Sequence, residues 1–172
     1  FDYASTDNSV NIVKDICPTW EIRQTKYKEW DFGDNDAEFM AAEREVAGYK
    51  MVLTTTEFLS FLPELSEEPT CYAARIFRAV DNNPATKPIY NKGLLDQKPS
   101  GYLATINRHR FLHNHKDGAY LGLGRHKTAH KITPTPATVY KCVYSPWTEE
   151  FIQRKLSMSD KLSGAAKGGS HH

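Results

Sequence analysis

Two apolar runs, CYAARIFRAV at residues 71–80 and ATVYKCVYS at 137–145, decide the fold predicted for this chain. Both mix aromatic and β-branched residues, which favours strands, and the second run alternates most clearly. The segment between Cys71 and Pro146 also holds most of the residues suited to chemistry. The rest of the chain is therefore interpreted around it.

The connection between these strands has its own pattern. DGAYLGLGRHKTAHKI, residues 117–132, predicts a tight turn at Asp117–Gly118, a short strand over 119–123 and a short helix over 127–132. The TPTP that follows predicts a rigid, extended spacer because proline fixes its own φ angle.

Helical patterns dominate the first part of the sequence. The Asp34–Asn35–Asp36 cluster predicts a helix start, and the residues up to Gly48 have helical spacing and propensity. TTTEFLSFLPEL at 54–65 predicts a second amphipathic helix, and Ser9–Ile16 predicts a short helix or strand. A further helix is predicted to begin at Thr148.

The fold expected from these elements is α+β, with an N-terminal helical part packed on a mostly antiparallel β-sheet. One globular domain is expected over 1–157, mainly helical over 1–70 and sheet-rich over 71–157. The ending, residues 158–172, has the composition of a linker and a purification-tag remnant, GAAKGGSHH.

Composition excludes several functional classes. Apolar residues make up 40% of the chain without a run of about twenty, so a soluble protein without membrane insertion is expected. A net charge of +1 argues against a protein that neutralises many phosphates of a duplex. Three cysteines are too few for a disulfide framework, although one bridge stays open. Compartment and oligomeric state stay open, and a secreted or delivered effector is one possibility.

Histidines between 109 and 130 carry one candidate chemistry. His113 and His115 form an HxH pair, while His126 and His130 have the i, i+4 spacing of one helix face. Four imidazoles permit a zinc shell, but no carboxylate or cysteine follows at a typical interval, so no metal ligand is assigned. The same residues suit acid–base cleavage of RNA, with His113 and His126 as catalytic candidates and nearby Lys and Arg stabilising the phosphorane.

The order of elements around Arg78 carries another candidate. A strand ending in Arg78, a segment ending in Gly93–Leu94, a Gly-x-Tyr element at Gly118–Tyr120 and a later strand together resemble the ADP-ribosyltransferase superfamily over about 71–150. The resemblance implies NAD as cofactor and a macromolecular acceptor, protein or nucleic acid. It places the cofactor-binding roles and the late catalytic glutamates on the following residues: Arg78, Gly118, Tyr120, Gly122 and Gly124 for NAD, and Glu149 and Glu150 for catalysis.

Three functions therefore stand as alternatives. The first is an ADP-ribosyltransferase-like toxin or effector domain that transfers ADP-ribose from NAD. The second is a ribonuclease-type toxin that uses the His/Lys/Arg cluster. The third is a non-enzymatic effector or interaction domain.

Overall fold

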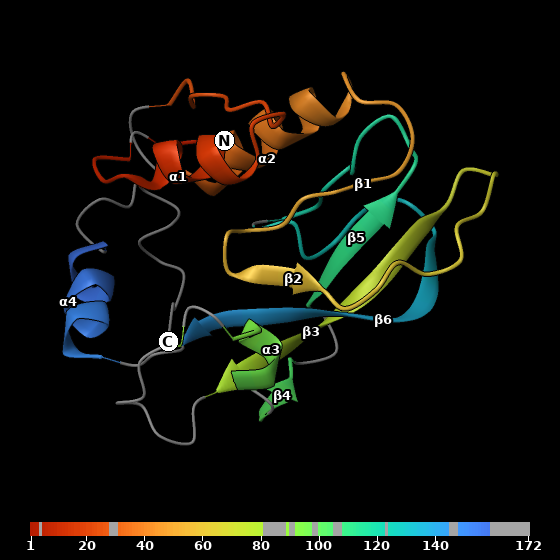
Figure 1. Cartoon of the computed structure of the whole chain (residues 1–172). Coiled ribbons are helices and arrows are strands. Elements are labelled where there is room, and N and C mark those ends of the chain that lie inside the picture. Colours follow the sequence, from red (N-terminus) through yellow and green to blue (C-terminus); the bar gives the residue numbers. More distant parts are fainter. Residues whose placement is uncertain are drawn as a thin grey trace.

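The structure is a computed structural model that describes residues 1–3, 5–27, 31–80, 89, 92–97, 100–104, 108–122, 124–144 and 148–158. It has an α+β fold built on a mixed, curled β-sheet (Figure 1). Trp30, Pro146 and the predicted tail from residue 159 onward lie outside the described residues.

Within the described residues the sheet has six strands, ordered β1-β5-β3-β6-β2, with β4 paired to β3 beyond this path. The β3–β6 pair is parallel and the other pairs are antiparallel. The strand bounds are Lys50–Met51 (β1), Glu57–Leu59 (β2), Cys71–Val80 (β3), Gly101–Leu103 (β4), His109–His113 (β5) and Ile132–Tyr144 (β6). The strand predicted over 71–80 is confirmed as β3, and the second predicted strand is confirmed as the later part of β6.

Strand β3 buries both of its faces, which explains its nearly continuous apolar run. On one face Ala74 and Ile76 form a core cluster with Val139 of β6. On the other face Cys71 and Ala73 form a second cluster with Phe111 of β5, against which Tyr120 packs. Successive side chains of a strand point to opposite faces, so β3 supplies both clusters. Cys17, Cys71 and Cys142 are not joined by disulfide bonds in the structure.

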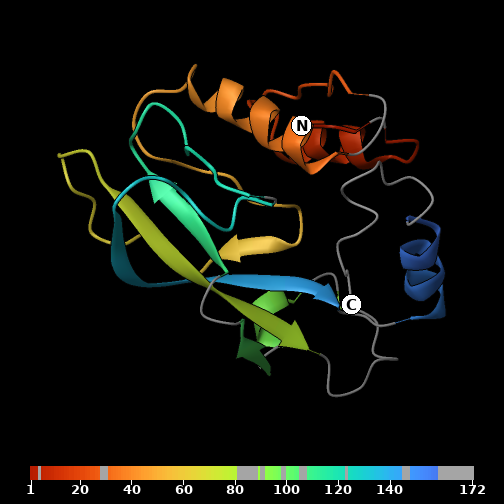
Figure 2. The ribbon, with the colours of Figure 1, turned by 180° about the vertical axis from the view of Figure 1, so that it is seen from behind.

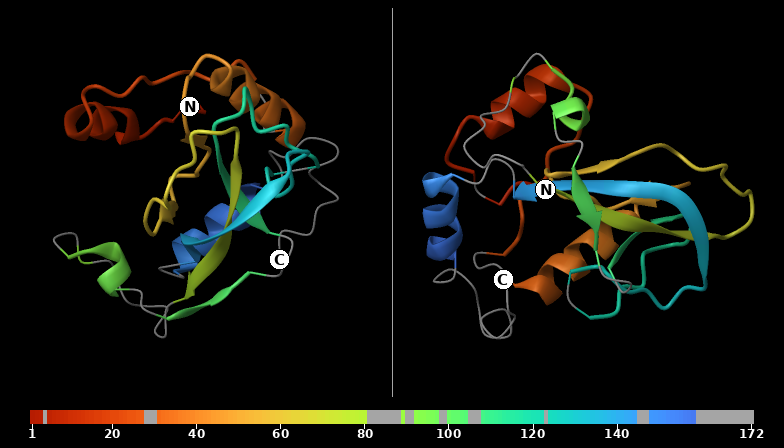
Figure 3. Two further views of the ribbon diagram at one scale, coloured as in Figure 1. Left: turned by 90° about the vertical axis from the view of Figure 1, so that its right-hand side faces the viewer. Right: turned by 90° about the horizontal axis from the view of Figure 1, so that it is seen from below.

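Strand β6 bends where its prolines lie. Ala73 pairs with Pro134, whereas Arg75, two residues later, pairs with Thr138, so β6 carries extra residues at this point. Prolines are tolerated at such irregular positions because the ladder hydrogen bonds are already interrupted there. The predicted spacer is therefore extended, as expected, but it belongs to the sheet and contributes to the curl visible in Figure 3.

The helices have bounds Ser9–Ile16 (α1), Phe32–Glu43 (α2), Leu94–Gln97 (α3) and Glu149–Met158 (α4). Helices α1 and α2 overlap in the views of Figures 1 and 2, but Figure 3 shows them apart from each other, and α4 is separate from both. Asp31 caps α2 by accepting from the backbone N–H groups of Gly33 and Asp34. The helix ends at Glu43, earlier than the predicted end at Gly48. Near this end, Nζ of Lys50 binds the carbonyl oxygens of Glu43 and Val46.

Three predicted elements are wrong. The predicted second helix, residues 54–65, contains strand β2 instead, so the first 70 residues supply two strands as well as two helices. Pairing of β2 with β6 overrides its helical periodicity. The described residues 119–122 and 127–131 do not form the predicted strand and helix: Tyr120 and Thr128 form an isolated β-bridge within one loop, and Ile132 begins β6. Among the described residues, no helix is long and apolar enough to cross a membrane.

Candidate active site

The start of β5 places two kinds of side chain on opposite faces of the sheet. His109 and Phe111 lie opposite Arg75 and Ala73 of β3 and share their face, whereas Arg110 lies between them and points the other way. One short strand therefore supplies an imidazole and an aromatic ring to one side and a guanidinium to the other.

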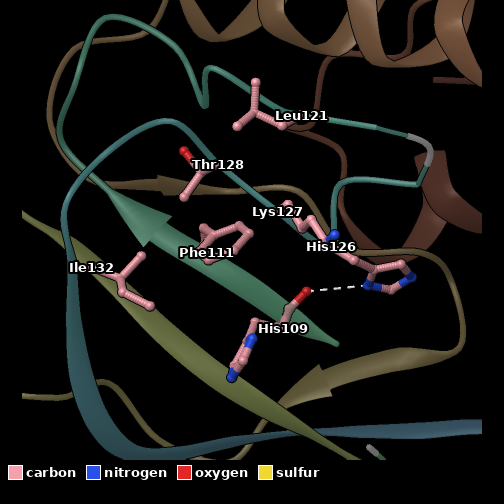
Figure 4. Close-up of a pocket in the computed structure, with 7 residues that line it drawn as sticks. All are labelled: His109, Phe111, Leu121, His126, Lys127, Thr128 and Ile132. Atoms are coloured by element: carbon pink, nitrogen blue, oxygen red, sulfur yellow. Dashed lines mark hydrogen bonds between the residues drawn. The ribbon is translucent and has the colours of Figure 1, made fainter. Parts of the chain in front are cut away.

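A pocket of about 270 Å³ lies over the face that carries His109 and Phe111 (Figure 4). The two rings are neighbours, with centroids 6.2 Å apart. The residues that line the pocket are His109, Phe111, Leu121, His126, Lys127, Thr128 and Ile132. Apolar walls with a few convergent polar groups are typical of a small-molecule or nucleobase site, although this volume is at the small end for drug-sized ligands.

Four of these residues come from the hairpin loop, defined here as residues 118–130. Its two arms are joined by hydrogen bonds from Leu121 N–H to the Lys127 carbonyl and from Ala129 N–H to the Ala119 carbonyl. The loop turns through positive φ angles at Gly122 (71°) and Gly124 (81°), which glycine adopts without strain. These glycines, predicted to allow close approach of a cofactor, thus have a structural role in the turn.

Arg125 anchors the hairpin loop to α2. It has a positive φ of 58°, which is costly for a residue with a side chain, and it is buried. Its Nη1 lies 2.6 Å from Asp36 of α2, and its guanidinium stacks over the ring of Phe39 at 4.4 Å. A charge-assisted bond and a cation–π contact therefore hold the strained turn in place.

His126 is positioned by the buried Arg110. Its Nδ1 lies 3.2 Å from Nη1 of Arg110 and 3.3 Å from the carbonyl oxygen of His109. Burial, together with the positive charge of Arg110, lowers the pKa of His126 to about 4. The ring is therefore neutral at physiological pH. Its Nε2 is free to accept a proton in the tautomer whose Nδ1–H donates to the His109 carbonyl oxygen.

Arg110 is fixed in turn by a buried carboxylate. Its Nε and Nη2 form a two-pronged pair with Glu57 of β2, at 2.8 and 2.9 Å, and Nζ of Lys141 binds the same carboxylate at 2.9 Å. Both members of the Arg110–Glu57 pair are almost completely buried. These two cations lower the pKa of Glu57 to about 2, even though burial acts in the opposite direction.

The pKa of His109 is lowered as well. Burial lowers its pKa below the ordinary 6.5, and the charge of Arg75 on the neighbouring strand adds to this shift. His109, His126 and Lys127 thus line one pocket, but the His126 ring turns toward Arg110 and points away from the His109 ring (Figure 4).

His113 does not join His126. It lies four residues after His109, about 13 Å further along β5 at the rise of an extended strand. It is fully buried, and its Nε2 lies 3.2 Å from Glu43 of α2. The two histidines that the sequence proposes as a catalytic pair are thus separated, and His109 takes the place of His113 at the pocket.

The residues predicted to bind NAD also occupy separate places. The hydroxyl of Tyr120 donates to Glu43 at 2.6 Å, and its ring packs against the Cys71–Ala73–Phe111 cluster. Arg78 lies toward the other end of β3, about 23 Å from Cys71 along the strand, where its Nη1 donates to the Tyr102 hydroxyl. Neither residue lines the pocket.

The other residues predicted for the NAD site are Gly118, Glu149 and Glu150. A Cβ atom at Gly118 would lie only 2.1 Å from the ring of Tyr120, so a side chain there would collide with it. The backbone N–H of Gly118 donates to Glu43. Glu149 and Glu150 are exposed in the first turn of α4, where acidic residues favour the helix dipole, and Glu149 accepts from Gln153. The NAD site remains a prediction.

The remaining histidines stack beside α2 rather than forming a helix face. The rings of His115 and His130 are parallel with centroids 3.8 Å apart, and Nε2 of His130 lies 2.8 Å from the carbonyl oxygen of Asp117. Within the described part of the chain, no group of three or more His, Cys, Asp or Glu residues is arranged to hold a metal ion.

Sequence reasoning missed Glu57, Arg110 and Lys141. They are far apart in the chain, and Glu57 lies in a segment whose pattern predicts a helix. Only the pairing of β2 with β6, which sets Glu57 opposite Lys141, reveals the cluster. No protein-family model, curated protein or solved structure matches the chain.

Proposed function

We propose that the protein is a ribonuclease-type enzyme that cleaves RNA at the pocket over the start of β5. The observation that carries this proposal is that His109, His126, Lys127 and Phe111 line one pocket, where Nδ1 of His126 lies beside the backbone carbonyl of His109. Two imidazoles and a cation are the groups that transesterification of RNA requires, and an aromatic ring offers a surface for a base.

In this proposal His126 is the general base, because its pKa near 4 keeps the ring unprotonated. It accepts the proton of the ribose 2′-hydroxyl while the 2′-oxygen forms a bond to phosphorus. The bond from phosphorus to the 5′-oxygen breaks, and protonated His109 gives its proton to that leaving oxygen. The products are a 2′,3′-cyclic phosphate and a free 5′-hydroxyl.

Lys127 has the electrostatic role. The negative charge that develops on the phosphorane is stabilised by a cation placed beside it before the reaction begins. Arg110 and Glu57 do not contact substrate in this proposal. They position His126 and are too buried to bind a polynucleotide.

The test is cleavage of a single-stranded RNA oligonucleotide, with identification of the cyclic phosphate product. We expect His109→Ala and His126→Ala each to lower the rate by 10²–10⁴-fold, the usual contribution of general acid–base catalysis. His115→Ala is the matched control, since it removes an imidazole outside the pocket and should retain the rate. Intact RNA with the wild type, or unchanged cleavage by both pocket variants, would overturn the proposal.

The NAD hypothesis is the competing explanation and has a separate test. Release of nicotinamide from NAD by the wild type, lost in Arg78→Ala, would support an ADP-ribosyltransferase-like function. It would also require Arg78 and Tyr120 to act on one ligand from opposite ends of β3.

A further inference from the structure

Arg75 is the exposed cation nearest to His109 in the sheet. The two residues are directly opposite each other on β3 and β5, so their side chains leave the same face. Directly opposite Cβ atoms are about 4.5–5.5 Å apart, and the charge of Arg75 already lowers the pKa of His109. A guanidinium therefore stands beside the imidazole that faces the pocket.

The charge of Arg75 is not neutralised by the described parts of the chain. Its side chain has no ion-pair or hydrogen-bond partner among the described residues, unlike Arg110, which is saturated by Glu57 and backbone carbonyls. Lys127, also exposed, lines the pocket from the hairpin loop. Two cations thus flank His109 from different elements.

We infer that this site takes single-stranded RNA, with one unpaired base in the pocket and the adjacent phosphate bound by Arg75. The inference rests on the proposed function and adds the substrate class and the phosphate-binding residue. The ring of Phe111, with Leu121 and Ile132, forms an apolar surface for one base. An arginine binds phosphate through two parallel N–H groups, which a lysine does not match.

A duplex does not fit this arrangement. A base reaches a pocket of about 270 Å³ only after leaving its stack, which costs a few kcal/mol in a duplex and little in a single strand. The protein also lacks the charge excess that duplex binding by phosphate contacts requires, since its formal net charge is +1.

The experiment measures binding without cleavage. Fluorescence anisotropy is recorded with a labelled 2′-fluoro RNA, which lacks the attacking hydroxyl, as a single strand and as a perfect duplex. Wild type, Arg75→Ala, Arg75→Lys and the control Lys14→Ala are compared, because Lys14 is an exposed cation on α1. Thermal unfolding midpoints confirm that each variant is folded.

We expect the single strand to bind at least tenfold more tightly than the duplex. Arg75→Ala should weaken single-strand binding about tenfold and reduce the salt slope by about 0.7, the value for one phosphate contact, while Arg75→Lys restores part of the affinity. Lys14→Ala should match the wild type.

Equal binding of duplex and single strand, no RNA binding by the wild type, or Arg75→Ala indistinguishable from wild type would each overturn the inference. The proposed function is tested separately. RNA that binds through Arg75 but is never cleaved would contradict the ribonuclease proposal and would still support the binding site. An equal cleavage rate in Arg75→Ala and the wild type would contradict only the inference about Arg75.

Discussion

His109, Arg110 and His126 show how neighbouring residues receive different tasks from their surroundings. His109 faces the pocket, whereas Arg110 turns inward to Glu57 and holds His126. The same residue type, histidine, is a half-buried acid candidate at one position and a neutral base candidate at another. Burial and the nearest cation set this difference.

The rate of RNA cleavage should depend on pH through His126 and His109. His126 must be unprotonated, so the rate should rise as the pH increases through about 4. His109 must be protonated, so the rate should fall above its pKa, which lies below 6.5. A pH–rate profile should therefore be bell-shaped with its maximum between these limits, and a rate that keeps rising to pH 8 would contradict the assigned roles.

The buried carboxylate of Glu57 gives a stability prediction. Glu57→Ala leaves Arg110 buried without its partner, which typically costs about 3–5 kcal/mol. Denaturant unfolding measures this loss. Glu21→Gln, which removes a carboxylate from an exposed ion pair, is the control and should leave the unfolding midpoint unchanged.

The lowered pKa of Glu57 also sets the pH range over which Glu57 stabilises the folded protein. Because its folded pKa, about 2, is below the ordinary 4.5, its stabilising effect is complete above 4.5 and is lost as the pH falls toward 2. The stability of a Glu57→Gln variant should depend less on pH over this interval than that of the wild type. An identical dependence would show that other groups dominate acid unfolding.

At the scale of elements, the hairpin loop depends on α2. Arg125 keeps a strained backbone conformation because Asp36 and Phe39 bind its side chain. Asp36 also accepts from the N–H of Gly124, so one carboxylate holds two successive residues of the turn before His126. Helix and loop therefore form one positioning unit for the pocket.

Asp36→Ala should consequently destabilise the protein by about 3–5 kcal/mol, because Arg125 stays buried without its ion-pair partner. It should also lower RNA cleavage, since His126 loses its fixed position. Asp34→Ala removes an exposed carboxylate from the same helix and is the matched control. Full cleavage activity in a folded Asp36→Ala variant would show that the loop keeps its geometry without this contact.

The stacked histidines at the other end of the loop predict acid sensitivity. Burial, followed by the charges of His130 and His113, lowers the folded-state pKa of His115 below 6.5. The unfolded chain then binds a proton first, so stability is complete above about 6.5 and falls as the pH drops to the folded pKa. His115→Gln should reduce this dependence in unfolding measured from pH 7 to 5, and an unchanged slope would exclude His115 as a contributor.

At the scale of the whole molecule, the near-zero net charge limits how many phosphates the protein binds. With Arg75 and Lys127 as the two phosphate contacts, the logarithm of affinity for single-stranded RNA should fall with the logarithm of salt concentration at a slope of about −1.4. Anisotropy titrations at several salt concentrations measure this slope. A value several-fold steeper would indicate a longer basic track than these two residues.

Local sequence patterns suffice to predict the elements whose signals are strong. Aromatic and β-branched residues predicted β3 and the later part of β6, the second also by alternation, and an Asp-rich segment located α2. The sequence also directed attention to the His-rich segment 109–130. Its errors lie where local pattern conflicts with pairing: 54–65 has helical spacing, yet Glu57–Leu59 joins the sheet.

Which of these residues lie together depends on the tertiary structure. It replaced His113 with His109 beside His126, separated Arg78 from Tyr120 along β3, and joined Glu57, Arg110 and Lys141 in one buried cluster. The physical reason is that strand pairing and sheet curvature fix distances between residues remote in sequence. Alternation along a strand gives each side chain a face, but the register with its neighbours gives it partners.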